Sequence, residues 1–120
     1  MQRLITWAGR AALLLVLGVA LVGALDPHHD AARHAPKGDV VEHVAYGYLL
    51  TVLTIAALPR VNPWLIGGAY LAVGAGFEAL QVWGLVSGTF QWKDLASNTG
   101  GVAAALAPFA LARRRSGGRR

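Results

Sequence analysis

The sequence predicts an all-α protein, a polytopic transmembrane four-helix bundle, from its composition and from the distribution of its charges. The chain has 120 residues, of which 55% are hydrophobic and 14% are charged, far from the average composition of a soluble domain. The charged side chains are concentrated in short stretches between long apolar runs. An amphipathic soluble helix would instead alternate polar and apolar faces. The pattern therefore indicates a membrane protein with a single domain over residues 1–112.

Four apolar runs predict four helices, because about 20 consecutive apolar residues are needed to cross a bilayer. The predicted helices cover about residues 4–25, 40–58, 64–86 and 95–112. The first is long enough if Arg10 extends its charged group toward the interface. The fourth spans about 27 Å at 1.5 Å per residue, enough for a hydrocarbon core of about 30 Å with little tilt.

Two alternatives compete with this interpretation. A soluble four-helix bundle would need a polar face on each helix, and none of the four runs offers one. The first run also resembles a signal peptide, with Arg3 and Arg10 before the apolar stretch and small residues near its end. Cleavage there would leave three helices with the remaining topology unchanged.

The loops predict the orientation of the helices. Pro59 and Pro63 bound a short turn between the second and third helices. The two termini and this turn together hold eight Lys and Arg residues, whereas the other two loops hold three. The positive-inside rule then places both termini in the cytoplasm, with loops 26–39 and 87–94 outside the inner (plasma) membrane. Trp7, Trp64, Trp83 and Trp92 fall near helix ends, as interfacial anchors do.

Charge and cysteine content exclude several classes of function. The chain has no cysteine, which excludes disulfides, thiolate nucleophiles and Cys-ligated metal sites. The net charge is +5, but five of the eleven basic residues lie in a predicted disordered cytoplasmic tail, residues 113–120. We expect no nucleic-acid partner and no cofactor. His28, His29 and His34 lie in the first loop at spacings that match no metal motif, so we interpret them as part of a solvated loop.

Polar residues inside the apolar runs are the candidates for function. An ionisable group near the bilayer centre costs about 2.5–3.5 kcal/mol, so such groups normally face the bundle and find partners. The costly residues are Glu42 and His43 in the second helix, Glu78 and Gln81 in the third, and Asp94 and Asn98 at the start of the fourth. Counting 1.5 Å per residue from each helix end places all of them within one outer layer about 10 Å thick.

Their spacing also places them on shared helix faces. Residues three or four apart lie on one face of a helix, and this relation holds within each of the three helices. The simplest arrangement is one outer-leaflet pocket formed by His43, Tyr46, Glu78, Gln81, Asp94 and Asn98. Small residues such as Gly74, Gly84, Gly100 and Gly101 would allow the helices to approach closely.

Three roles for this cluster remain open. The side chains can hydrogen-bond across helices and simply fix the packing, in a structural partner of a larger envelope complex. They can bind the polar head of an amphipathic ligand whose tail stays in the outer leaflet. They can also catalyse a reaction on a lipid head group, with His43 as general base or metal ligand and Glu78 or Asp94 as acid or orienting group. No nucleophile motif supports the third role, and whether the protein is an enzyme stays undecided.

The third and fourth predicted helices carry a motif that resembles a known family. Glu78-Ala79-Leu80-Gln81, the linker Phe90-Gln91-Trp92-Lys93-Asp94 and Asn98-Thr99-Gly100 are similar to the E-x-x-Q, D-W-x-D and N-x-x-G elements of VanZ-like membrane proteins. The stretch 39–46 around His43 resembles the start of that family's second helix, and the likeness covers roughly residues 39–107. Gln91 stands where the signature has its first Asp.

The resemblance implies a small integral membrane protein of the cell envelope. The namesake of the family gives low-level resistance to the glycopeptide teicoplanin, so an effect on glycopeptide susceptibility is an expectation from the resemblance alone. The expected partners are membrane lipids, lipid-linked envelope intermediates or a lipoglycopeptide head. The sequence gives no oligomeric state.

Overall fold

The computed structural model describes residues 1–25, 36–86 and 90–117, and all the regular secondary structure in this part of the chain is α-helix. It contains α1 (Gln2–Leu25), α3 (Pro36–Ala57), α4 (Pro63–Val82) and α5 (Trp92–Gly117), with no strand among the described residues. All four helices are long and apolar enough to cross a membrane. The predicted all-α class with four such helices is confirmed.

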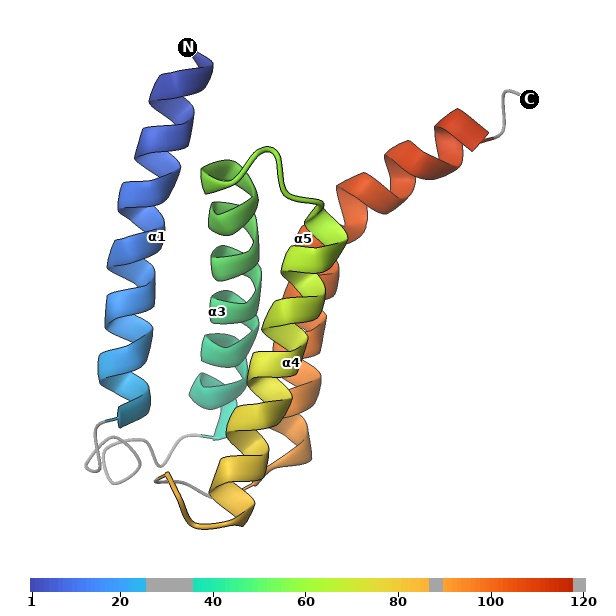
Figure 1. The fold of residues 1–120 in the computed structure, drawn as a ribbon. Coiled ribbons are helices and arrows are strands. Elements are labelled where there is room, and N and C mark those ends of the chain that lie inside the picture. The colour runs from blue at the N-terminus through green and yellow to red at the C-terminus, as the bar shows by residue number, and fades with distance from the viewer. Residues whose placement is uncertain (26–35, 87–89, 118–120) are drawn as a thin grey trace.

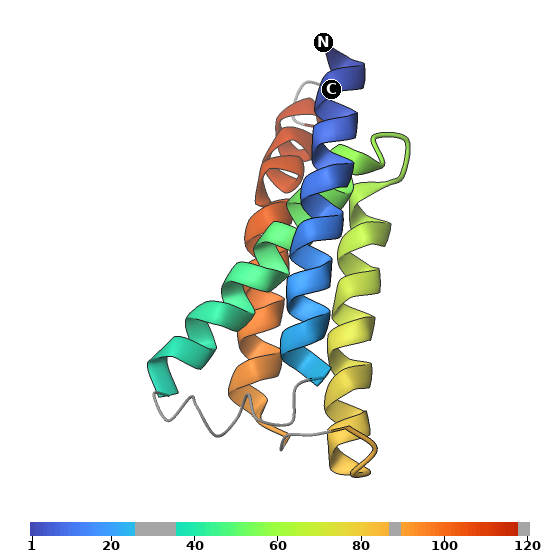
Figure 2. The ribbon, with the colours of Figure 1, turned by 90° about the vertical axis from the view of Figure 1, so that its left-hand side faces the viewer.

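The helices form an elongated bundle around the pair α3 and α5 (Figures 1 and 2). The most extensive packing is between α3 and α5, while α1 packs mainly on α3 and α4 mainly on α5. We call the end at which α4 ends and α5 begins the site end, and the opposite end the basic end. Figure 1 shows the start of α1 and the end of α5 both at the basic end.

Local sequence signals fix the bounds of α4. Asn62 caps its start, because the side-chain oxygen accepts a hydrogen bond of 3.0 Å from the backbone N–H of Trp64, and Pro63 follows at the first helical position. The helix stops at Val82, earlier than the predicted end at residue 86. The cause is Gly84, whose φ of +68° lies in the left-handed region that ends helices and favours glycine.

The last helix is longer than predicted. It begins at Trp92 and continues through Arg113 to Arg115, so residues 113–117 are helical where a disordered tail was expected. Pro108 lies inside the helix, where it cannot donate the usual backbone hydrogen bond. Beyond this region α5 bends away from the other helices as a separate arm (Figure 1).

Most large apolar side chains point away from the bundle. Among the residues that the structure describes, the buried apolar side chains are Ala57, Ile66, Val102, Ala105 and Leu106. By contrast, Leu14 and Leu15 on α1 are each 70% exposed, and Leu65 on α4 is 69% exposed. A soluble protein rarely exposes a continuous apolar surface of this kind, whereas a surface in contact with lipid requires it.

At the basic end, α1 is attached to α3 by close backbone contact and one polar contact. A Cβ atom at Gly9 would lie 3.1 Å from the Cβ of Ala56, so glycine allows the two helices to approach. Arg10 Nε donates a hydrogen bond of 3.2 Å to the backbone oxygen of Ala57, the last residue of α3. This contact satisfies a carbonyl that has no partner within its own helix.

Candidate functional site: a polar cluster at one end of the bundle

Two glycines bring α3 and α5 into close contact near the site end. A Cβ atom at Gly47 would lie 2.7 Å from the backbone oxygen of Asn98. A Cβ atom at Gly101 would overlap the backbone oxygen of Val44 and lie 2.8 Å from the backbone nitrogen of Tyr48. Since any other residue would push the helices apart, these glycines set the distance between the polar side chains that lie just beyond them.

His43 and Asp94 meet across this contact. His43 Nε2 lies 3.7 Å from Asp94 Oδ2, and the two side chains are 30% and 9% exposed. Asp94 occupies the first turn of α5, where a negative charge is favoured by the backbone N–H groups of the helix start. The arrangement places a buried carboxylate next to a partly exposed imidazole.

Glu78 joins α4 to the segment that leads into α5. The residue is only 5% exposed, and its Oε2 accepts a hydrogen bond of 3.2 Å from the backbone N–H of Gln91. Burial of a carboxylate is costly unless it is hydrogen-bonded, so this contact lowers the cost of placing Glu78 inside the bundle. It also holds the chain just before Trp92, where α5 begins.

Asn98 lies where three helices approach one another. Its backbone oxygen faces Gly47 on α3, and its side-chain nitrogen would lie 3.4 Å from a Cβ atom at Gly74 on α4. Its partly buried side chain therefore reaches from α5 toward α4. Asn98 is positioned one turn along α5 from Asp94.

The structure thus shows direct contacts for some of the predicted site residues. For the others it shows only where they lie. His43 contacts Asp94, while Glu78 contacts the linker and Asn98 approaches α4. Tyr46 and Gln81 are partly buried and lie one turn from His43 and Glu78 on the same helices. The six predicted residues lie on α3, α4 and α5, in the halves of these helices that are nearer the site end.

Sequence reasoning missed two buried polar residues in this region. Thr51 is fully buried and Ser97 is 8% exposed. Their hydroxyls donate to the backbone oxygens of Gly47 and Lys93, at 2.7 and 2.6 Å, one turn earlier in their own helices. Ser and Thr in any helix can make this bond, so these residues carry no sequence signal for a ligand site.

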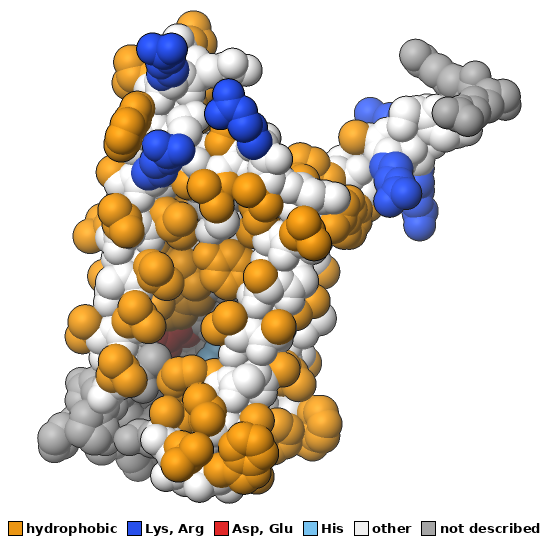
Figure 3. Space-filling model, viewed as in Figure 1, with side chains coloured by type: hydrophobic (Ala, Val, Ile, Leu, Met, Phe, Trp, Pro, Cys, Tyr) orange, Lys and Arg blue, Asp and Glu red, His pale blue; other side chains and the backbone are white. Residues whose placement is uncertain are grey.

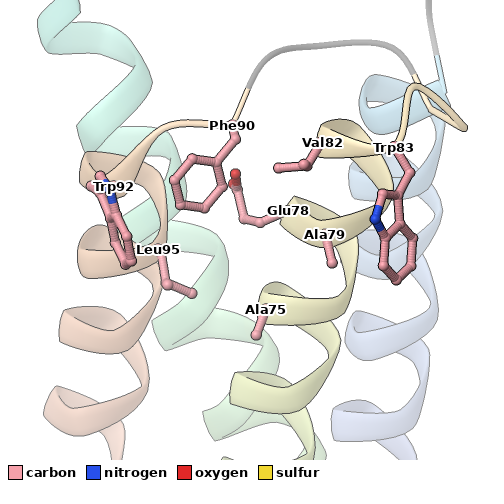
Figure 4. A pocket seen from close by; sticks show the side chains of 8 residues that line it. All are labelled: Ala75, Glu78, Ala79, Val82, Trp83, Phe90, Trp92 and Leu95. Atoms are coloured by element: carbon pink, nitrogen blue, oxygen red, sulfur yellow. The ribbon is translucent and has the colours of Figure 1, made fainter.

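A pocket of about 340 Å³ lies beside Glu78, between α4 and α5 (Figure 4). Its lining consists of Ala75, Glu78, Ala79, Val82, Trp83, Phe90, Trp92 and Leu95. Trp83 and Trp92, expected to be interfacial anchors, are 71% and 75% exposed and form part of the walls. The Phe90 and Trp92 rings meet edge to face, with centroids 4.9 Å apart and planes at 82°.

The cluster is also accessible from the opposite side of α4. Figure 3 shows a hollow between α1 and α4, with acidic and histidine side chains at its floor. Among the described residues, no three His, Asp or Glu side chains lie close enough to hold a metal ion. The histidines of the first loop, His28, His29 and His34, lie outside the residues that the structure describes.

Comparisons with known proteins give no further assignment. No family model matches the chain, and searches of curated proteins and of solved structures found no match. The fold and the site therefore define only the class of protein. Its described part consists of four helices that are long and apolar enough to cross a membrane, with buried polar side chains toward one end.

Proposed function

We propose that the protein binds the polar head of an envelope amphiphile at the site end. The ligand is a membrane lipid, a lipid-linked glycan or a lipoglycopeptide, held from the outer leaflet of the inner (plasma) membrane. The observation that carries this proposal is that His43, Glu78 and Asp94, from three different helices, all lie toward one end of the bundle, with His43 3.7 Å from the buried Asp94 and with Glu78 buried. Ionisable residues within membrane spans are costly and generally serve a function.

The surroundings of the cluster fit an amphipathic ligand. His43 is 30% exposed, so a polar head can reach an imidazole that already contacts a carboxylate. The hollow between α1 and α4 opens onto this region, and the exterior next to it is apolar (Figure 3). A head group can therefore contact the cluster while its tail stays among acyl chains.

The charge distribution supports the outward orientation of the site. Arg113, Arg114 and Arg115 belong to the end of α5, and α1 begins with Arg3 in its first turns. Figure 3 shows Lys and Arg side chains gathered at the basic end and on the arm. Under the positive-inside rule this end faces the cytoplasm, with both termini, which leaves the site end outside.

The proposal includes a relation to VanZ-like proteins. The elements that carry the resemblance, around His43, Glu78 and Asp94 to Asn98, are the ones that supply the cluster. A role in glycopeptide susceptibility follows from that resemblance. We expect a change in teicoplanin susceptibility when the chain is expressed, and the change should be lost with Asp94→Asn.

Native mass spectrometry of the gently extracted protein tests lipid binding directly. We expect the wild type to retain one lipid class enriched several-fold over the surrounding membrane, and Asp94→Asn to lose most of that enrichment. Thr99→Ala is a matched control, because Thr99 is exposed on the same helix and its hydroxyl donates a hydrogen bond to the backbone oxygen of Leu95, one turn earlier in that helix. Wild-type protein that carries lipids in bulk proportions would refute the proposal.

The contact between His43 and Asp94 also favours a second candidate, an enzyme that acts on a lipid head group. A carboxylate beside an imidazole orients it and supports its use as a general base. Incubation of the purified protein with labelled envelope lipids tests this candidate. A new product that disappears with His43→Ala is expected for the enzyme, whereas bound and unaltered lipid supports the binding role.

A further inference from the structure

The basic end of the bundle carries positive charge that no described acidic residue balances. The acidic residues that the structure describes all lie in the halves of α3, α4 and α5 that are nearer the site end: Asp39, Glu42, Glu78 and Asp94. The described arginines all lie toward the basic end, on α1, on the turn before α4 and on the last turns of α5: Arg3, Arg10, Arg60, Arg113, Arg114 and Arg115. Charge of a single sign at one end of a molecule favours an anionic partner there.

Most of these guanidinium groups have no partner among the described residues. Arg10 is engaged, because it donates to the backbone oxygen of Ala57 and lies 5.0 Å from the centre of the Trp7 ring. The other five arginines are exposed, and their side chains make no ion pair or hydrogen bond with any residue that the structure describes. An exposed guanidinium group presents five N–H donors, and a phosphate group accepts them in pairs.

The last part of α5 projects from the bundle. We define the arm as residues 109–117, which follow Pro108 within the helix and bend away from the other helices (Figure 1). Residues 111–117 are all exposed, so packing on the other helices does not hold the arm in place. So short a helical segment has little stability in water on its own, and a membrane interface that receives it would supply the missing contacts.

The composition of the arm changes along its length from apolar to basic. Phe109 and Leu111 are 37% and 57% exposed, and the arginines 113–115 follow directly. This order matches the boundary of a bilayer, where acyl chains give way to charged head groups. Trp7 and Trp64, which are exposed toward the same end, are of the residue type typical of this boundary. A nucleic acid would leave the apolar start of the arm without a contact, so an anionic lipid fits the whole surface better.

We propose that the arm lies in the membrane interface and binds the phosphate groups of anionic lipids through Arg113, Arg114 and Arg115. Arg3 and Arg60 add positive charge at the same end of the bundle. The lipids belong to the leaflet at the basic end, and the apolar start of the arm lies among their acyl chains. The inference goes beyond the proposed function, because it concerns the opposite end of the bundle and does not depend on what the site end binds.

Electron paramagnetic resonance of spin-labelled lipids tests the selectivity in the full chain, reconstituted in phosphatidylcholine bilayers. The fraction of labelled lipid that the protein immobilises is measured for phosphatidylglycerol, which is anionic, and for phosphatidylcholine, which is zwitterionic. We expect the anionic lipid to associate at least about threefold more strongly. This preference should fall as the salt concentration is raised, because exposed charges are screened. Equal association of the two lipids would overturn the inference.

Variants of the arm locate the preference. The triple replacement Arg113→Gln, Arg114→Gln and Arg115→Gln should remove about half or more of it, whereas replacement of the same three residues by Lys should keep most of it. All three side chains are exposed, so both variants should unfold at the wild-type temperature. An unchanged lipid preference in the Gln variant would overturn the assignment. If the oligomeric state of that variant changed instead, the arm would be a contact between copies of the chain, which also overturns it.

A spin label on Leu111→Cys reports where the arm lies, because the chain has no other cysteine. In bilayers that contain phosphatidylglycerol, we expect this label to be more accessible to oxygen, which dissolves among acyl chains, than to a water-soluble nickel chelate. A label on Ser116→Cys, beyond the arginines, should show the opposite order. If the nickel chelate reaches both labels more readily than oxygen does, the arm lies in water and the inference is wrong.

Discussion

The two buried carboxylates of the site differ in their contacts. Asp94 faces the imidazole of His43, an ionisable partner on another helix. Glu78 accepts a hydrogen bond from a backbone N–H in the linker. A buried carboxylate that contacts main chain has a structural role in addition to any ligand contact, because its removal leaves a donor without its acceptor.

Replacement of Glu78 by Ala should therefore destabilise the linker. The backbone N–H of Gln91 would lose its acceptor, and because this hydrogen bond is partly buried we expect a cost of about 1 kcal/mol. Glu78→Gln keeps a carbonyl oxygen at the same position and should retain most of the stability. Thermal unfolding in detergent and amide hydrogen exchange at residues 90–92 measure the effect. Identical exchange in the wild type and in Glu78→Ala would contradict this role.

At the scale of the helices, one close contact sets the geometry of the site. Gly47 and Gly101 let the backbones of α3 and α5 touch, and His43 and Asp94 lie next to this contact. The neighbouring Gly100 has no atom within 4 Å of the position that a Cβ would take. A side chain at Gly101 would therefore overlap the backbone of α3, whereas a methyl group at Gly100 would meet no neighbouring atom.

Substitution of these two glycines should have opposite effects. Gly101→Ala places a methyl group against the backbone of α3, so we expect a loss of about 1–3 kcal/mol in the free energy of unfolding. Gly100→Ala adds a methyl group in open space and improves helix propensity, so it should be neutral or stabilising by up to about 1 kcal/mol. Denaturant unfolding in mixed micelles compares the two variants. Equal effects would show that α3 and α5 are not in contact at Gly101.

The length and polarity of the helices could be predicted from the sequence, but several of their ends could not. Four apolar runs indicate four helices, because a segment surrounded by lipid must satisfy its own backbone hydrogen bonds and a helix does so. The end of α4 depends on the positive φ of Gly84, and a glycine in an apolar run is equally compatible with continued helix. The end of α5 depends on whether a basic segment continues the helix after Pro108, and composition alone favours disorder there.

The site could be predicted in outline only. Spacing placed His43, Glu78 and Asp94 at one end, and the structure places them there. Which side chains touch depends on the pairing of α3 with α5, and Gly47, which permits it, was missed among the glycines of the chain. One partner of Glu78 is a main-chain N–H group, and such groups cannot be predicted from residue identity because every residue other than proline has one.

For the whole molecule, the start of α1 and the end of α5 lie at the basic end, and the site lies at the opposite end (Figure 1). Four crossings of a membrane require the two termini to be on the same side. The observed arrangement meets this requirement, with arginines at that side. The proposed ligand then approaches from the leaflet that the arginines do not face.

Single cysteines test this topology without interference, because the chain has none of its own. Leu85→Cys, at the site end, should react with a membrane-impermeant maleimide in intact cells. Val61→Cys and Ser116→Cys, at the basic end, should react only after the cells are permeabilised. All three residues are partly or largely exposed in the bundle, so access is limited by the membrane. Labelling of Leu85→Cys and Val61→Cys from the same side would contradict four crossings.

Photo-crosslinking in living cells tests most directly whether the site end holds a selected amphiphile. p-Benzoylphenylalanine replaces Phe90 beside Glu78 in one protein, and Leu15 on the exposed face of α1 in another. We predict that position 90 forms adducts enriched several-fold in one lipid class, while position 15 forms adducts in the proportions of the surrounding membrane. The same adduct profile at both positions would show that the polar cluster selects no ligand.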